Sequence, residues 1–246
     1  MPIGSFQIYY ADGDSSQRST ALIEDPEAPD NQVLEFRLHK ANELHLTSAD
    51  KGRIQFGFNN NEELYALSYS TKMRFQEGFS LLPQHPDAIT WLTVAEFWNN
   101  IANESFPFRI TLNINKEDGI DAPLYWHMHA QNRISKGDWN TIWDGGDKTV
   151  PVPIQEWFTL HVDLQEGCTE TGWFRVRITL EDGTEYTIVD ETQITQHPED
   201  PIPDGFGAFN PLKLYTSSDT IDWVRNNGED LVILWDDFYL YQGTQP

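Results

Sequence analysis

Tyr-Trp-His-Met-His-Ala-Gln, residues 125–131, is the stretch that decides the fold class of this chain. Successive side chains of a β-strand point to opposite faces of the sheet. A strand here would therefore gather the polar residues on one face, namely Tyr125, His127, His129 and Gln131. The tryptophan, methionine and alanine between them would face a core. The stretch predicts a sheet with one dry side and one side that carries acid, base and hydrogen-bonding groups.

The same alternation recurs in three other segments, whose polar residues again fall on one face. These residues are Glu35, Arg37 and His39 in the first, Arg109, Thr111, Asn113 and Asn115 in the second, and Lys213, Tyr215 and Ser217 in the third. A polar face is ordinary for any strand that is half exposed to solvent. Imidazole pairs, Lys-x-Tyr and Glu-x-Arg are nevertheless unusual choices for an idle face, so they favour a binding or catalytic surface.

Apolar residues along the chain follow a period of two far more often than the helical period of 3.6. The strand candidates are 33–38, 53–58, 64–69, 91–98, 108–115, 124–130, 158–164, 173–180, 185–190, 212–216 and 231–241. Turn-forming pairs such as Asp182-Gly183 separate them. Because no internal repeat or linker interrupts the pattern, we expect one domain over residues 1–246. Short strands with almost no helix predict an all-β fold, a two-sheet antiparallel β-sandwich of the jelly-roll type.

The chain carries a formal net charge of −23, which argues against nucleic acid as a partner, because binding a polyphosphate needs lysine and arginine. An acidic polysaccharide would also be repelled at long range. Charges are screened beyond roughly 8 Å at physiological salt, however, so a few cations inside a cleft would dominate locally. A polysaccharide or oligosaccharide remains the expected partner.

Cys168 is the single cysteine, so no intrachain disulfide is expected. No run of about 18 apolar residues occurs, and we expect no membrane span. The N-terminus lacks the basic start and apolar stretch of a signal peptide. We therefore expect a cytoplasmic protein, or a secreted or periplasmic one if a leader was removed. We also expect the protein to be a monomer.

Several stretches resemble segments of one superfamily. Leu34-Glu-Phe-Arg37 resembles the end of the first conserved strand of polysaccharide lyases, and Phe209-Asn-Pro-Leu-Lys-Leu-Tyr215 resembles their late strand, which carries a catalytic tyrosine. Residues 156–162 and 172–178 resemble the Trp-anchored strand and the strand that follows it. The chain is thus similar to concanavalin A-like jelly-roll proteins, and among them to the polysaccharide lyases that act on alginate and heparin-like chains.

The resemblance implies β-elimination on a uronic-acid polysaccharide. This reaction needs a neutralised carboxylate, a base that takes the C5 proton and an acid for the leaving oxygen. Tyr215 would serve as base and acid, with Lys213 and Arg37 beside it to favour loss of its proton.

The remaining groups of the expected site would neutralise charge. Arg37 or Arg109, together with Gln131, would neutralise the substrate carboxylate, and His127 or His129 would stabilise the charge that develops. Further substrate contacts are expected from Lys213, Glu96, Glu35, Trp98 and Tyr125.

The chain departs from the lyases at their Gln-x-His position, where it has Glu96 and Trp98, and its paired imidazoles come on the next predicted strand. Two other functions therefore stay open. A non-catalytic, lectin-like carbohydrate-binding protein needs only an aromatic and polar cleft, with Trp98, Trp139 and Trp143 as candidate sugar platforms. A glycoside hydrolase needs two carboxylates at a set separation, for which Glu96 and Glu35 are candidates.

No cofactor is required by this chemistry, but the resemblance implies a structural Ca²⁺ on the side away from the cleft. Asp236 would be one ligand, and Asp12 and Asp14 could supply further oxygen ligands. A buried aspartate satisfied by a backbone amide or an arginine is the alternative. A transition metal is less expected, because His-x-His alone lacks a clear third ligand.

Overall fold

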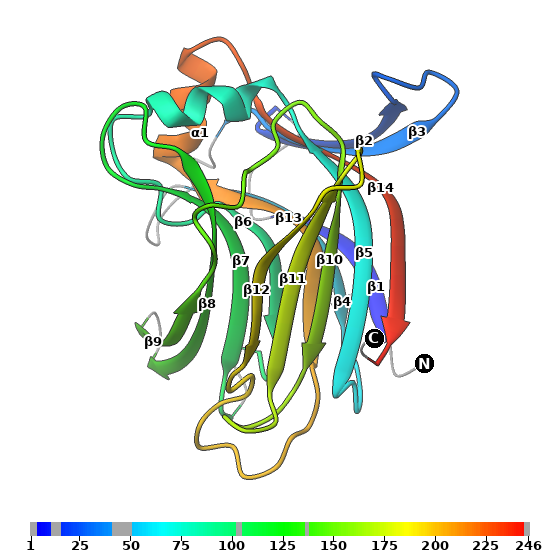
Figure 1. Ribbon diagram of the computed structural model, residues 1–246, viewed down its shortest axis with the longest axis vertical. Coiled ribbons are helices and arrows are strands. Elements are labelled where there is room, and N and C mark those ends of the chain that lie inside the picture. The colour runs from blue at the N-terminus through cyan, green and yellow to red at the C-terminus, as the bar shows by residue number, and fades with distance from the viewer. Residues whose placement is uncertain (1–3, 11–15, 41–50, 102–104, 136–137, 244–246) are drawn as a thin grey trace.

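The computed structural model describes residues 4–10, 16–40, 51–101, 105–135 and 138–243. Its strands form two seven-stranded sheets, and paired strands run antiparallel (Figure 1). In order across the first, the cleft sheet, lie β1 (Ser5–Tyr10), β4 (Lys51–Asn59), β13 (Ala208–Ser217), β6 (Thr93–Trp98), β7 (Phe108–Lys116), β8 (Leu124–Ser135) and β9 (Asp138–Gly145). Across the second, the back sheet, lie β12 (Glu185–Thr192), β11 (Trp173–Leu180), β10 (Phe158–Gln165), β5 (Ala66–Phe75), β14 (Leu231–Gln242), β3 (Gln32–Leu38) and β2 (Arg18–Glu24). The predicted all-β sandwich is confirmed.

Each strand candidate from the sequence overlaps a strand of the structure. The strands that sequence periodicity missed are β1, β2 and β9, which carry weaker apolar alternation. Two helical elements were also missed, the 3₁₀ helix η1 (Glu77–Gln84) and the α-helix α1 (Ser218–Asn226). The long connections between the strands contain these helices at one end of the sandwich (Figure 1).

The core lies between the two sheets, and β8 shows why the alternation along residues 125–131 is decisive. Trp126, Met128 and Ala130 are fully buried, whereas the residues between them are partly exposed on the other face. The Trp126 ring lies 6.1 Å from that of Phe75 and 6.0 Å from that of Phe158, both on the back sheet. Aromatic contacts of this kind join the sheets into one apolar cluster. That the whole chain is one domain stays a prediction.

The α1 helix begins directly after β13, at the end of the strand that carries Tyr215. Ser217 caps it, because its hydroxyl accepts a hydrogen bond from the backbone N–H of Thr220 at 3.3 Å. Ile221 and Val224 are buried on one face of the helix and belong to the core. The run Ser-Ser-Asp-Thr has the composition of a loop, which is why sequence periodicity does not reveal so short a helix. Among the described residues, no helix is long and apolar enough to span a membrane.

Candidate functional site

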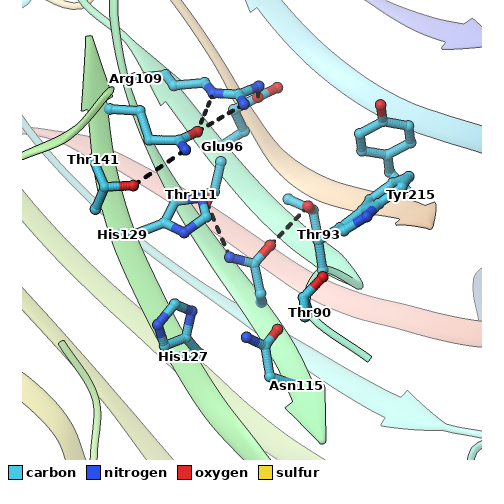
Figure 2. A pocket seen from close by; sticks show the side chains of 13 residues that line it. Thr90, Thr93, Glu96, Arg109, Thr111, Asn115, His127, His129, Thr141 and Tyr215 are labelled. Carbon is cyan, nitrogen blue, oxygen red and sulfur yellow. Dashed lines mark hydrogen bonds and ion pairs between the residues drawn. The ribbon is translucent and has the colours of Figure 1, made fainter. Parts of the chain in front are cut away.

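The outer face of the cleft sheet is hollowed into an open cleft of about 530 Å³ (Figure 2). Its lining comes from β6, β7, β8, β9, β13 and the segment before β6, and comprises Thr90, Trp91, Thr93, Glu96, Arg109, Thr111, Asn113, Asn115, His127, His129, Gln131, Thr141 and Tyr215. Strand pairing brings these residues together, since Arg109 lies opposite Gln131, Thr111 opposite His129 and Asn113 opposite His127. The polar faces predicted for three separate segments therefore form one surface.

A row of alternating charges crosses one end of the cleft. Glu96 on β6 is 5% exposed, and it forms ion pairs with Lys213 of β13 and with Arg109 of β7, whose Nη1 lies 3.3 Å from Oε1. Arg109 also donates to Oε1 of Gln131 on β8, through Nε at 3.0 Å and Nη2 at 2.8 Å. The row contains two cations for one anion, so it carries net positive charge.

The pKa values of this row follow from burial and from that excess of cations. Burial of Glu96 opposes its ionisation, but the charges of Lys213 and Arg109 outweigh burial and lower the pKa of Glu96 to about 2. Burial lowers the pKa of Lys213 to about 8, and Arg53 and Arg109 add to this effect although Glu96 opposes it. At neutral pH both partners of the Glu96–Lys213 pair are therefore charged.

Tyr215 lies against three cations at the opposite wall of the cleft from the histidines (Figure 2). The charged atoms of Lys213, Lys51 and Arg53 lie 5.0, 5.5 and 5.8 Å from the centroid of its ring. The Trp91 ring packs beside it, with centroids 4.7 Å apart. These three cations concentrate positive charge around the Tyr215 ring.

The two imidazoles of β8 face the cleft next to each other, with ring centroids 5.5 Å apart. Burial lowers the pKa of His127, although Asp144 opposes this. Burial and the charges of His127 and Arg109 lower the pKa of His129 to about 4. Both rings are therefore neutral at pH 7, and each offers one N–H and one lone pair.

A chain of hydrogen bonds fixes the floor between Tyr215 and the histidines. The Thr93 hydroxyl donates to Oδ1 of Asn113 at 2.8 Å, and Nδ2 of Asn113 donates to the Thr111 hydroxyl at 3.0 Å. All three side chains are nearly fully buried. Their mutual bonding keeps the floor rigid.

Two of the predicted site residues, Arg37 and Glu35, lie on the wrong sheet. They are on β3 of the back sheet, where Arg37 donates to Glu35 at 3.0 and 2.8 Å and to Asp230 at 2.8 Å. This overturns the predicted roles of Arg37 beside Tyr215 and of Glu35 as a substrate contact. Strand alternation shows that two residues share a face, but it does not show which sheet the strand joins. For this reason Arg37 and Glu35 were wrongly expected in the cleft.

The three candidate sugar platforms lie in two places, two of them beside Arg109 and one against the core. Trp98 and Trp139 flank Arg109, whose guanidinium carbon lies 5.7 and 4.2 Å from the two ring centroids. Trp143 instead packs against Phe174 of the back sheet, because a register shift in the β8–β9 pairing turns it inward. Its indole N–H donates to the backbone oxygen of Ile194. Trp143 is therefore not a sugar platform.

The other predicted residues lie at the edge of the cleft or away from it. Tyr125 lies next to His127 on the polar face of β8, and its hydroxyl donates to Glu117 at 3.3 Å. On the back sheet, Asp236 accepts from Nδ2 of Asn31 and from the backbone N–H of Asp237, both at 2.8 Å. These bonds match the alternative to a Ca²⁺ site, in which a backbone amide satisfies the carboxylate of Asp236. Asp12 and Asp14 lie outside the described residues, so the Ca²⁺ site stays a prediction.

Sequence reasoning missed Trp91, which lines the cleft, and Lys51, Arg53 and Asp144, which lie next to residues that line it. Arg53 and Gln55 alternate with apolar Ile54 and Phe56, and Arg53 pairs with Tyr215 across β4 and β13. This alternation was available in the sequence. Asp144 was hidden because β9 itself was not predicted.

No protein-family model matches the sequence, and no curated protein matches it. Solved structures do share the fold. An endo-β-1,4-glucuronan lyase from the fungus Trichoderma reesei aligns with a TM-score of 0.55 and 14% identity, over 96% of this chain and 90% of that one. The PL-14 alginate lyase from Aplysia kurodai aligns with a TM-score of 0.53 and 10% identity over the same shares.

A third similar structure is the GH16 protein of the Bacteroides ovatus mixed linkage glucan PUL, in complex with a G4G4G3G product. Its TM-score is 0.56 at 10% identity, over 98% of this chain and 95% of that one. Identities this low show the fold alone. The concanavalin A-like jelly roll predicted by resemblance is confirmed.

Proposed function

We propose that this protein is a polysaccharide lyase that cleaves a uronic-acid polysaccharide by β-elimination in the cleft of the cleft sheet. The observation that carries the proposal is the set of cations around Tyr215 and Glu96, in a chain whose net charge is −23. Arg109 lines the cleft, and Lys51, Arg53 and Lys213 lie against its Tyr215 wall, so positive charge concentrates here in an otherwise acidic molecule. Such a wall fits a polyanionic substrate.

The reaction can be assigned to groups that the cleft brings together. Arg109, held by Gln131, would neutralise the substrate carboxylate and so acidify the C5 proton. The Tyr215 phenolate would take that proton as the C4–O4 bond breaks. The electron pair of the C5–H bond becomes the C4–C5 double bond, and the Tyr215 hydroxyl then returns the proton to the leaving oxygen. The N–H of neutral His129 would stabilise the charge on the carboxylate during this step.

The glycoside-hydrolase alternative finds less support. Glu96 and Glu35 lie on different sheets, so they do not form a pair across a scissile bond. Glu96 itself is held ionised by Lys213 and Arg109, because they lower its pKa to about 2, and an ionised carboxylate does not act as a general acid. Among the described residues that line the cleft, it is the one carboxylate. Two of the proteins that share the fold are polysaccharide lyases, and this similarity also favours elimination over hydrolysis.

Incubation with a panel of uronic-acid polysaccharides, including glucuronan and alginate, tests the proposal. Elimination creates a C4–C5 double bond conjugated to the carboxylate, so we expect ultraviolet absorbance to rise with at least one member of the panel. A neutral β-glucan should give no such product. Release of reducing ends without new absorbance would instead identify a hydrolase, and binding without cleavage of any polymer would identify a lectin.

The binding of an anionic oligosaccharide should weaken as the pH rises from 7 to 9. Lys213 is cationic below its pKa of about 8 and neutral above it, so the cleft loses one positive charge in this range. We expect the dissociation constant to rise roughly threefold to tenfold. Calorimetry with the Tyr215→Phe variant, which should bind without cleaving, measures the change, and a neutral oligosaccharide of equal length serves as control. A flat profile for the anionic ligand would show that Lys213 does not contribute.

A further inference from the structure

The imidazole pair of β8 has a carboxylate neighbour that the sequence did not reveal. His127 and His129 both face the cleft, and Asp144 of β9 pairs with His129 across the two strands. The Asp144 Oδ1 atom lies 3.4 Å from Nε2 of His127 and 4.0 Å from Nδ1 of His129. We propose that His127, His129 and Asp144 form a binding site for a Zn²⁺ ion.

The spacing of the three side chains is close to what a zinc ion requires. Their nearest ligand atoms all lie within 4.8 Å of one another. Tetrahedral zinc with bonds of about 2.0–2.1 Å holds its ligand atoms about 3.3 Å apart. The His127–Asp144 separation already fits, and the Asp144 side chain is 58% exposed, so it can turn toward His129 without disturbing the core.

The chemical character of the three ligands selects a borderline transition metal. Zinc commonly binds imidazole nitrogen, and both imidazoles line the cleft next to the Asp144 carboxylate. Two nitrogens and one carboxylate oxygen suit Zn²⁺, whereas Ca²⁺ and Mg²⁺ prefer oxygen ligands throughout. Three protein ligands also leave a fourth position open, and two of the three ligands line the cleft.

The charges around this cluster come from the neighbouring strands and loops. Arg109 of β7 faces His129, and Lys148 faces His127, so both cations oppose a bound metal ion. Lys148 itself forms an ion pair with Glu117. Asp144 supplies the negative charge that a dication needs.

A metal ion here would give the cleft a positive charge that two neutral imidazoles lack. The role of this positive charge in substrate binding rests on the proposed function. The open coordination position would meet the carboxylate of a uronate residue and share its neutralisation with Arg109. The metal site itself requires no assumption about the reaction.

Calorimetric titration of Zn²⁺ into chelator-treated full-length protein tests the site. We expect one ion per chain with a micromolar or tighter dissociation constant. His127→Ala, His129→Ala and Asp144→Asn should each weaken binding by roughly 100-fold, because each removes one of three ligands. Co²⁺ in place of Zn²⁺ should give the visible absorption bands of a tetrahedral site, and these bands should vanish in His129→Ala.

Two control variants separate this site from other histidines. His161→Ala removes an imidazole of the back sheet, and His85→Ala disrupts a second cluster with Asp87 and Asp219; neither should change the affinity. Absence of stoichiometric binding, or equal binding by His127→Ala, His129→Ala and wild type with unchanged circular dichroism, overturns the proposal. So does loss of binding in His85→Ala alone.

Assays of cleavage with and without chelator keep the two proposals apart. Cleavage that persists in a protein with no zinc affinity would refute the metal site and leave the lyase intact. Zinc binding by a protein that cleaves no uronic-acid polymer would refute the lyase and leave the metal site intact.

Discussion

Replacing Tyr215 with phenylalanine should abolish elimination while leaving substrate binding nearly unchanged. The variant loses only the hydroxyl that takes the C5 proton and returns it to the leaving oxygen, and proton transfer of this kind contributes roughly 10²–10⁴-fold to rate. We expect kcat to fall by at least about 100-fold. The phenyl ring keeps its contacts with Trp91 and with the cations of β4 and β13, so the dissociation constant should change less than about threefold. Initial rates of product absorbance, and calorimetry with the same oligosaccharide, measure the two effects.

Tyr239→Phe provides a matched control for this change. Tyr239 is 53% exposed on β14 of the back sheet, so loss of its hydroxyl should alter neither rate nor binding. If Tyr215→Phe retained more than about a tenth of the wild-type rate, Tyr215 could not be the base and acid.

Replacing Lys213 with methionine should destabilise the protein strongly. Lys213 is 1% exposed, and its removal leaves the buried carboxylate of Glu96 with Arg109 as its one remaining ion-pair partner among the described residues. Breaking a buried ion pair costs roughly 3–5 kcal/mol, and the contact with Arg109 places the expected loss near 3 kcal/mol. For a chain of this length, the corresponding fall in Tm is roughly 6–12 °C. Thermal unfolding followed by circular dichroism measures it.

The double variant Glu96→Gln/Lys213→Met identifies the cause. It removes both charges, so most of the lost stability should return. Lys72→Met is the control, because Lys72 and Asp237 form an exposed pair 3.7 Å apart, which contributes at most about 1 kcal/mol. Equal losses in the single and double variants would mean that packing around Lys213, and not its charge, stabilises the strand.

The fold was largely predictable, because period-two alternation reports directly on burial. On β8, every residue predicted to face the core is buried, and every one predicted to face the polar side is partly exposed. The strands that were missed lie at sheet edges, β1 and β9 at the two ends of the cleft sheet and β2 at one end of the back sheet. An edge strand packs less of its surface, so its sequence carries less alternation.

The candidate site was predictable only in part, because alternation says nothing about which strands become neighbours. Tyr215, Arg109 and the histidines line the cleft as expected, with Lys213 buried beside Tyr215, since their strands join the same sheet. Arg37 shows the same pattern on β3, but it forms an ion-pair network with Glu35 and Asp230 on the back sheet. The pairing of β13 with β4 and β6 spans more than a hundred residues of sequence and is not encoded in any local motif.

The burial of Lys213 has a consequence for how the protein meets a polyanion at different ionic strengths. Salt screens the repulsion between the acidic surface and an approaching chain, because those charges stand in water. It screens a cation that is 1% exposed much less. The association rate of an anionic glycan should therefore rise with added salt before it falls, the reverse of the usual steering between opposite charges. We therefore expect the fastest association at an intermediate ionic strength.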